Sequence, residues 1–200
     1  MSKRQVPAEV LLSYARQAEL YRAQGKYAEA EPLLQLVLGV SEQQLGSRHT
    51  DTVRSLNSLA GIYQAQGQYE QAELLYKRAL AIHEQQSGPV HSDIATSLSN
   101  LAGIYRVQGK YEQAQPLYER ALAIHEHQSG STHSDTAQSL NNLAALYYSQ
   151  GKYEQAESLL QRALKISVQQ LGAEHPQTRV IQGNSMILLR LIQRTKKVLV

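Results

Sequence analysis

Residues 98–125 read LSNLAGIYRVQGKYEQAQPLYERALAIH, and this stretch decides the fold. One face of a helix is predicted by four apolar side chains at helical spacing: Leu98, Leu101, Ala102 and Tyr105. Gly109 comes directly after this series, where a residue in the left-handed conformation would end the helix. A second apolar series then begins and contains Ala114, Leu117, Tyr118, Ala121 and Leu122. The stretch therefore predicts a hairpin of two helices and shows no strand pattern.

The same pattern recurs every 42 residues. Glycine followed by lysine or glutamine and then tyrosine is found at Gly25, Gly67, Gly109 and Gly151. A second glycine series has the same period and contains Gly46, Gly88, Gly130 and Gly172. Segments 67–88 and 109–130 are identical at 17 of 22 positions, so the chain is an array of repeats.

The period sets the expected organisation of the chain. We expect repeats over 8–49, 50–91, 92–133 and 134–175, followed by a C-terminal helix over 176–197, all within one domain of residues 1–200. The paired helices are predicted at 8–24 with 27–45, 50–66 with 69–87, 92–108 with 111–129, and 134–150 with 153–171. Ser134 or Asp135 is the predicted N-cap of the fourth hairpin. The fold class is all-α.

Composition and charge exclude several functional classes. There is no cysteine, so disulfides and thiolate chemistry are absent. Five basic and no acidic residues follow Glu174, which leaves 15 basic against 17 acidic residues before it, so we expect no nucleic-acid partner. No apolar run is long enough to span a bilayer, and the first residues do not form a secretory signal. We expect a cytoplasmic protein without a membrane partner.

Catalysis and metal binding find no support in the motifs. No nucleophile elbow, phosphate-binding loop or zinc-binding His-Glu-x-x-His is present, so we expect no enzyme and no cofactor. Four histidines follow the repeat period, and they are His49, His91, His133 and His175. Equivalent residues one repeat apart lie too far from each other to share an ion at about 2 Å. We therefore predict no metal site and interpret these histidines as packing or capping residues.

The pattern Leu-x2-Leu-Ala-x2-Tyr, followed by Ala-x3-Tyr, resembles the tetratricopeptide repeat (TPR) signature, with Leu98 where that family often has tryptophan. The 42-residue unit is similar to the repeats of kinesin light chains and their bacterial relatives. The resemblance implies a solenoid of four helical hairpins plus the C-terminal helix, wound as a right-handed superhelix. Its first helices would line a concave groove that binds an extended peptide or partner segment.

Carried over from the family pattern, the groove positions that we select in this chain are Arg54, Asn57, Gln64, Ser99, Arg106, Gln138, Asn141, Tyr148 and Arg190. The side chains themselves favour peptide binding. Asparagine amides pair with peptide backbone, arginines attract carboxylates, and Tyr148 offers a flat apolar surface outside the tyrosine periodicity. Gly61, Gly103 and Ala145 would leave room for a peptide backbone. We therefore expect the partner to be another protein or a peptide. The positive charge of the arginines favours an acidic one.

Structural roles remain open for several of these residues. The 42-residue period relates Asn100, Asn142 and Asn184, whose alternative role is to form hydrogen bonds between neighbouring helices. The alternative role of Tyr148 is to cover a neighbouring helix. The C-terminal helix offers an alternative function, because it carries more apolar side chains than one face can bury. Self-association, or docking of a further domain, would then use Ile181, Ile187, Leu188, Leu191 and Ile192. We expect one stripe of this helix to pack on the fourth repeat and the other to be exposed.

Overall fold

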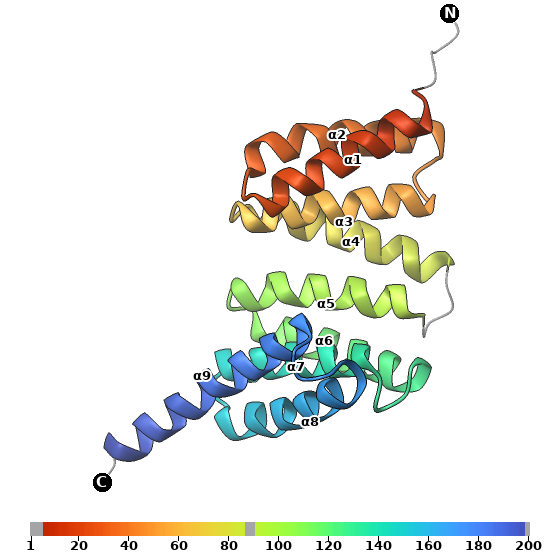
Figure 1. Cartoon of the computed structure of the whole chain (residues 1–200). Coiled ribbons are helices and arrows are strands. Elements are labelled where there is room, and N and C mark those ends of the chain that lie inside the picture. The colour runs from red at the N-terminus through yellow and green to blue at the C-terminus, as the bar shows by residue number, and fades with distance from the viewer. Residues whose placement is uncertain (1–5, 87–90, 199–200) are drawn as a thin grey trace, which may run out of the picture. The chain divides into compact units, whose positions relative to one another are not determined.

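The computed structural model describes residues 6–86 and 91–198, with side chains as far as residue 194. Within these ranges the chain is helical and contains no β-strand, which confirms the all-α class (Figure 1). The helices are Ala8–Ala23 (α1), Tyr27–Gln44 (α2), Thr50–Ala65 (α3), Tyr69–Gln86 (α4), Ser92–Val107 (α5), Tyr111–Gln128 (α6), Ser134–Ser149 (α7), Tyr153–Leu171 (α8) and Pro176–Val198 (α9). Each predicted helix boundary lies within one residue of the observed one.

The repeated glycines end the helices as predicted. Gly109 has a φ of 75°, which places it in the left-handed region. The amide of Lys110 then donates to the carbonyl of Tyr105 at 2.8 Å, which satisfies an otherwise free carbonyl in the last turn of α5. Gly88, which belongs to the second glycine series, lies outside the described residues.

The periodic histidines begin the first helices of the hairpins. His133 is the N-cap of α7, and its Nδ1 atom accepts a hydrogen bond from the amide of Asp135 at 3.2 Å. His49 and His91 cap α3 and α5 in the same way. The prediction of Ser134 or Asp135 as the cap was wrong, because α7 already begins at Ser134 and an imidazole nitrogen accepts the free amide. The capping interpretation of the histidines is confirmed at these three positions.

The chain divides into two compact units, Met1–Gln86 with α1 to α4 and Ser87–Val200 with α5 to α9. In the first unit α2 packs against α1 and α3, and α3 packs against α4. In the second unit α6 contacts α5 and α7, and α8 contacts α7 and α9. Ala102 and Ala114 are fully buried where α5 and α6 cross, and a larger side chain there would overpack the contact by about 1–3 kcal/mol.

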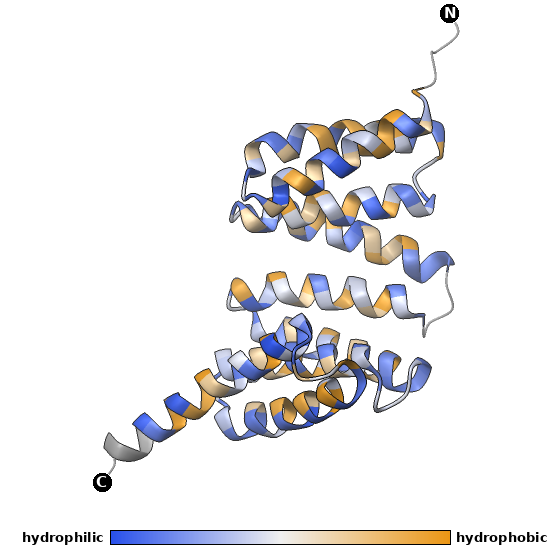
Figure 2. Cartoon of the chain, in the orientation of Figure 1, coloured by the Kyte–Doolittle hydropathy of each residue, from blue (hydrophilic) through white to orange (hydrophobic). Residues whose placement is uncertain are grey.

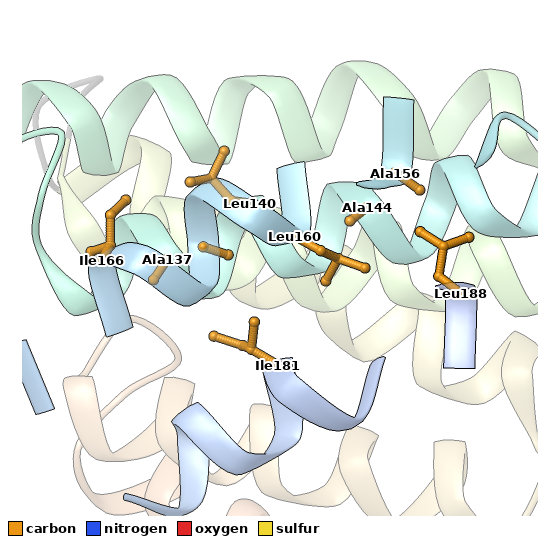
Figure 3. Close-up of a cluster of buried hydrophobic side chains, with 9 residues drawn as sticks. Ala137, Leu140, Ala144, Ala156, Leu160, Ile166, Ile181 and Leu188 are labelled. Carbon is orange, nitrogen blue, oxygen red and sulfur yellow. The ribbon is translucent and has the colours of Figure 1, made fainter. Parts of the chain in front are cut away.

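The core of the second unit extends from α7 and α8 to α9. Ile181 points from α9 toward Ala137 and Leu160 of the hairpin, and Leu188 lies farther along α9 near Ala144 and Ala156 (Figure 3). Both side chains are almost fully buried, with exposed fractions of 0% and 1%. Other apolar residues recur along α9 among polar ones (Figure 2), and they leave a second, exposed stripe on this helix. The expectation of one packed and one exposed stripe is therefore confirmed.

Candidate peptide-binding surface

The predicted groove residues lie in both units. Three of them are on α3 (Arg54, Asn57 and Gln64), and the other six are on α5, α7 and α9 of the second unit. They therefore form two separate sets, one on each unit.

In the first unit, Arg54 and Asn57 line a hollow of about 300 Å³ together with Gly61 and Tyr76. The charges around this hollow are already paired. Arg54 lies 2.9 Å from Asp51, and Arg22 at the rim lies 2.7 Å from Glu19. Gln64 also has an internal partner, because its Oε1 atom accepts a hydrogen bond from the Tyr76 hydroxyl at 3.3 Å. This surface therefore offers little net attraction for a charged ligand.

Arg106 on α5 is held by the scaffold of its own unit. Its guanidinium donates to the Tyr118 hydroxyl, and its Nη1 atom lies 3.4 Å from the Ser149 Oγ atom. Burial raises the pKa of Tyr118, and the nearby Arg106 lowers it in part. Both partners are neutral hydroxyls, so the positive charge of Arg106 is not neutralised, and its role toward a ligand stays a prediction. Ser99, on the same helix, is half-buried.

Gly103 and Gly61 each lie near a tyrosine hydroxyl of their own hairpin. A Cβ atom built on Gly103 would lie 3.5 Å from the Tyr118 hydroxyl, and one on Gly61 would lie 3.8 Å from the Tyr76 hydroxyl. Both distances are ordinary van der Waals contacts, and Gly61 together with Tyr76 still lines the hollow of the first unit. The expectation that these glycines leave room for a peptide backbone stays a prediction.

On α7 the predicted residues differ in how far they are available. Asn141 is only 5% exposed, and its Oδ1 atom accepts a hydrogen bond from Asn184 Nδ2 at 2.8 Å. Asn184 thus bonds between neighbouring helices, as one of the two interpretations predicted. Gln138 is exposed and donates to Asn142 at 3.0 Å. Tyr148 is 39% exposed, with its ring centre 5.9 Å from that of Tyr153.

Two adjoining hollows lie between α7 and α9. The first, of about 160 Å³, is lined by Asn141, Ala144, Ala145, Tyr148, Leu160, Asn184 and Ile187. The second, of about 300 Å³, is lined by Tyr148, Ile187, Arg190, Leu191 and Arg194. Because Tyr148 and Ile187 line both, we treat these residues as one surface, the α7–α9 groove.

The α7–α9 groove is apolar at one end and basic at the other. Arg190 and Arg194 are exposed, and within the described side chains neither forms an ion pair with an acidic residue. Arg179, nearer the start of α9, is by contrast paired with Glu174. A carboxylate entering this end of the groove would therefore meet two guanidinium groups without displacing an internal partner.

The candidates for self-association do not share one environment. Ile181 and Leu188 are buried within the unit, so they are not available to a second copy, and this part of the prediction is corrected. Ile192 is half-buried and packs against the same core. Ile187 is 56% exposed and, with the half-buried Leu191, lines the α7–α9 groove.

Comparison with known proteins decides the family. The tetratricopeptide repeat profile matches residues 9–85 and 93–167, which together make up most of the chain. The chain belongs to the tetratricopeptide repeat family. No curated protein sequence matches it.

Solved TPR structures are similar to this chain over most of its length. One is a Podosopora anserina protein assigned as a kinesin light chain with nearly identical TPR-like repeats, at 26% identity and a TM-score of 0.75. That match covers 98% of this chain and 92% of that one. Another is BtubC (BKLC) from P. vanneervenii, at 26% identity and a TM-score of 0.73, covering 88% of this chain and 70% of that one. The kinesin-light-chain-like character of the TPR array is thus confirmed.

Other kinds of site receive no support from the part of the TPR array that the structure describes. Its described residues contain no group of three or more histidine and acidic side chains arranged to hold a metal ion. In the same residues, no helix combines the length and the apolar character needed to cross a bilayer.

Sequence reasoning missed Leu160 and Arg194 as groove residues. Leu160 carried a signal, because it stands one repeat after Tyr118 and two after Tyr76 and so breaks a series of tyrosines. The only signal for Arg194 was its spacing of four residues from Arg190, which places both side chains on one face of a helix. Neither signal shows by itself that a hollow lies beside the residue.

Proposed function

We propose that this chain is a protein-interaction module that binds an extended, acidic segment of a partner protein, with the α7–α9 groove as its principal site. TPR folds of this type mediate interactions between proteins, and the proposal adds a place and a ligand chemistry. The observation that carries it is the groove itself, in which an apolar hollow adjoins Arg190 and Arg194. We place this interaction in the cytoplasm, without catalysis, cofactor or metal.

The chemistry of the groove supports an anchor residue flanked by carboxylates. Tyr148 and Ile187 are exposed apolar side chains between the two hollows, so a bound segment would remove their apolar surface from water. At the basic end, charge-assisted hydrogen bonds from a guanidinium to a carboxylate are about twice as strong as neutral ones. Further polar contacts within the second unit would come from Ser99, Arg106, Gln138 and Asn141. Arg54, Asn57 and Gln64 belong to the first unit and form a separate candidate surface.

The test uses phage-displayed dodecapeptides selected on the wild-type chain and on an Arg190→Glu, Arg194→Glu variant. We expect wild type to enrich peptides rich in Asp and Glu, whose affinity falls with added salt because exposed charges are screened. The double variant should bind them roughly tenfold or more weakly, which corresponds to about 1.4 kcal/mol or more. Arg179→Glu is a control for reversing a charge on α9 outside the groove.

Two results would contradict the proposal. One is an enriched pool without acidic residues, and the other is equal binding by wild type and the double variant. Melting temperatures of the double variant and the control should agree closely with that of wild type, because exposed charges contribute little to stability.

A second candidate function is self-association or docking of a further domain through α9. The observation that favours it is the exposure of Val180 and Ile187, at 57% and 56%, on one helix. Light scattering over a range of protein concentrations tests it. An increase in mass that Ile187→Glu abolishes would support assembly, and a constant monomer mass would contradict it.

We also propose that residues 1–200 form a single TPR domain. Adjacent repeats in such arrays stabilise one another, so calorimetry should show one cooperative transition. Two separate transitions would contradict this organisation.

A further inference from the structure

The first hairpin packs against α3 less closely than the third hairpin packs against α7. Leu20 on α1 and Ile104 on α5 occupy the same position of the repeat, two periods apart. Ile104 is fully buried, whereas Leu20 is 56% exposed. The helix α5 also contacts α7 directly, while α1 is joined to α3 mainly through α2. Space is therefore left between α1 and α3, within the first unit.

A hollow of about 680 Å³ occupies this space, and we call it the α1–α3 hollow. Its volume lies in the range of about 300–1,000 Å³ that is usual for sites of small-molecule ligands. Apolar side chains of α1 and α2 and two serines of α3 line it, and they are Ala15, Leu20, Leu34, Val37, Ser55 and Ser58. The hollow adjoins the smaller one beside Asn57, with which it shares Ser58.

The interior of the α1–α3 hollow favours an alkyl chain. Both serine hydroxyls already donate within the unit, from Ser55 to the carbonyl of Asp51 at 2.8 Å and from Ser58 to Glu19 at 3.3 Å. A polar ligand would therefore leave its own groups poorly paired against this lining. No aromatic side chain lines the hollow, so a ring would find no ring to pack against, whereas a flexible chain can follow the aliphatic wall.

The charges at the rim leave one cation unused. Glu19 lies 2.7 Å from Arg22, and Arg54 lies 2.9 Å from Asp51, so these four charges are paired. Arg16 also lines the hollow and is exposed, and it forms no ion pair with any side chain that the structure describes. A carboxylate at the rim would meet this guanidinium and stay in contact with water, which avoids the cost of burying a charge.

We propose that the α1–α3 hollow binds a free fatty acid, with its alkyl chain on Leu20, Leu34 and Val37 and its carboxylate on Arg16. Covering the exposed part of Leu20 removes apolar surface from water and contributes to the affinity. The α7–α9 groove fits such a chain less well, because its apolar hollow measures about 160 Å³ and carries two asparagine amides. The fatty-acid site is independent of the proposed peptide site, which lies in the other unit.

The test titrates the full chain with dodecanoate, kept below its critical micelle concentration, and follows methyl resonances by NMR. We expect saturable shifts at Leu20, Leu34 and Val37. Leu74 is the internal control, because it is 68% exposed on α4 and does not line the hollow, so unspecific adsorption of the chain would shift it too. Decanoate has two methylene groups fewer and should bind roughly threefold to tenfold more weakly.

Two pairs of variants separate the carboxylate from the chain. Arg16→Glu should weaken dodecanoate binding about tenfold or more, whereas Arg190→Glu makes the same change at an exposed arginine of the second unit and should not affect it. Leu20→Glu puts a carboxylate on the wall and should abolish the remaining shifts, whereas Leu74→Glu should leave them unchanged. All four side chains are exposed, so the melting temperatures should stay close to that of wild type.

Several results would overturn the inference. Wild type without saturable shifts, or with shifts as large at Leu74 as at Leu20, would show that the hollow is not a specific site. Shifts at Ile187 alone would place the fatty acid in the α7–α9 groove. Equal affinity of wild type and Arg16→Glu, or binding of dodecyltrimethylammonium as tight as that of dodecanoate, would contradict the role of Arg16. Each of these outcomes leaves the selection of acidic peptides by the second unit unaffected.

Discussion

The third and fourth repeats share a core but differ at the surface of their first helices. In the third repeat the Tyr118 hydroxyl lies beside Gly103 and interacts with Arg106. In the fourth, Leu160 and Ala145 leave a hollow, and Tyr148 stands exposed where Arg106 stands one repeat earlier. The comparison shows that changes at three positions alter the space and the exposed side chains beside a first helix while the fold is kept.

The largest expected effect tests the shared part of this comparison. Leu98 and Leu140 occupy equivalent positions and are both fully buried. Replacing either by alanine should lower the free energy of unfolding by about 2–5 kcal/mol, because a cavity remains in a packed core. Urea denaturation followed by circular dichroism gives both values. A difference between them larger than the spread of such measurements would show that the two cores are not equivalent.

The next effect converts the third repeat toward the fourth. Tyr118→Leu with Gly103→Ala removes a buried ring and the hydrogen bond from Arg106, so we expect a loss of about 2–4 kcal/mol. The reverse change in the fourth repeat, Leu160→Tyr with Ala145→Gly, should cost much less because it fills space. Equal losses from the two double variants, measured by denaturant unfolding, would contradict the idea that only the third repeat is filled.

A smaller effect separates the two kinds of arginine. Arg106→Glu should destabilise the chain by about 1–3 kcal/mol, because it breaks hydrogen bonds in a half-buried site. Arg190→Glu should change stability by less than about 0.5 kcal/mol, because the side chain is exposed. Thermal unfolding measures both. Equal and small changes would show that Arg106 is as free as Arg190.

The sequence predicted the fold far better than the site. The 42-residue period, the helical spacing and the glycines placed every helix boundary within one residue, because they act locally and recur. The role of Arg106 could not be predicted, because it depends on the direction in which Tyr118 crosses the hairpin. Leu160 was visible as a break in a tyrosine series, but its meaning requires the observation that the tyrosine ring lies beside the first helix.

The smallest expected effect concerns pH and again compares the two repeats. Buried His125 on α6 lies 2.8 Å from Ser139 Oγ, whereas Ser167 at the equivalent place on α8 lies 2.7 Å from Thr178 Oγ1. Burial lowers the pKa of His125, an effect that Asp135 opposes and His133 reinforces. Below the usual histidine pKa of about 6.5, the unfolded chain therefore binds the proton more readily than the folded chain.

Stability from this group is consequently present above pH of about 6.5 and falls as the pH drops below it. Melting temperatures of wild type and His125→Ser, recorded between about pH 7.5 and 5, check this sign. We expect wild type to lose more stability than the variant over that range, because the introduced serine does not titrate and gives the third repeat the chemistry of the fourth. Parallel curves for the two proteins would show that His125 is not the group responsible, and a steeper loss in the variant would reverse the sign of the argument.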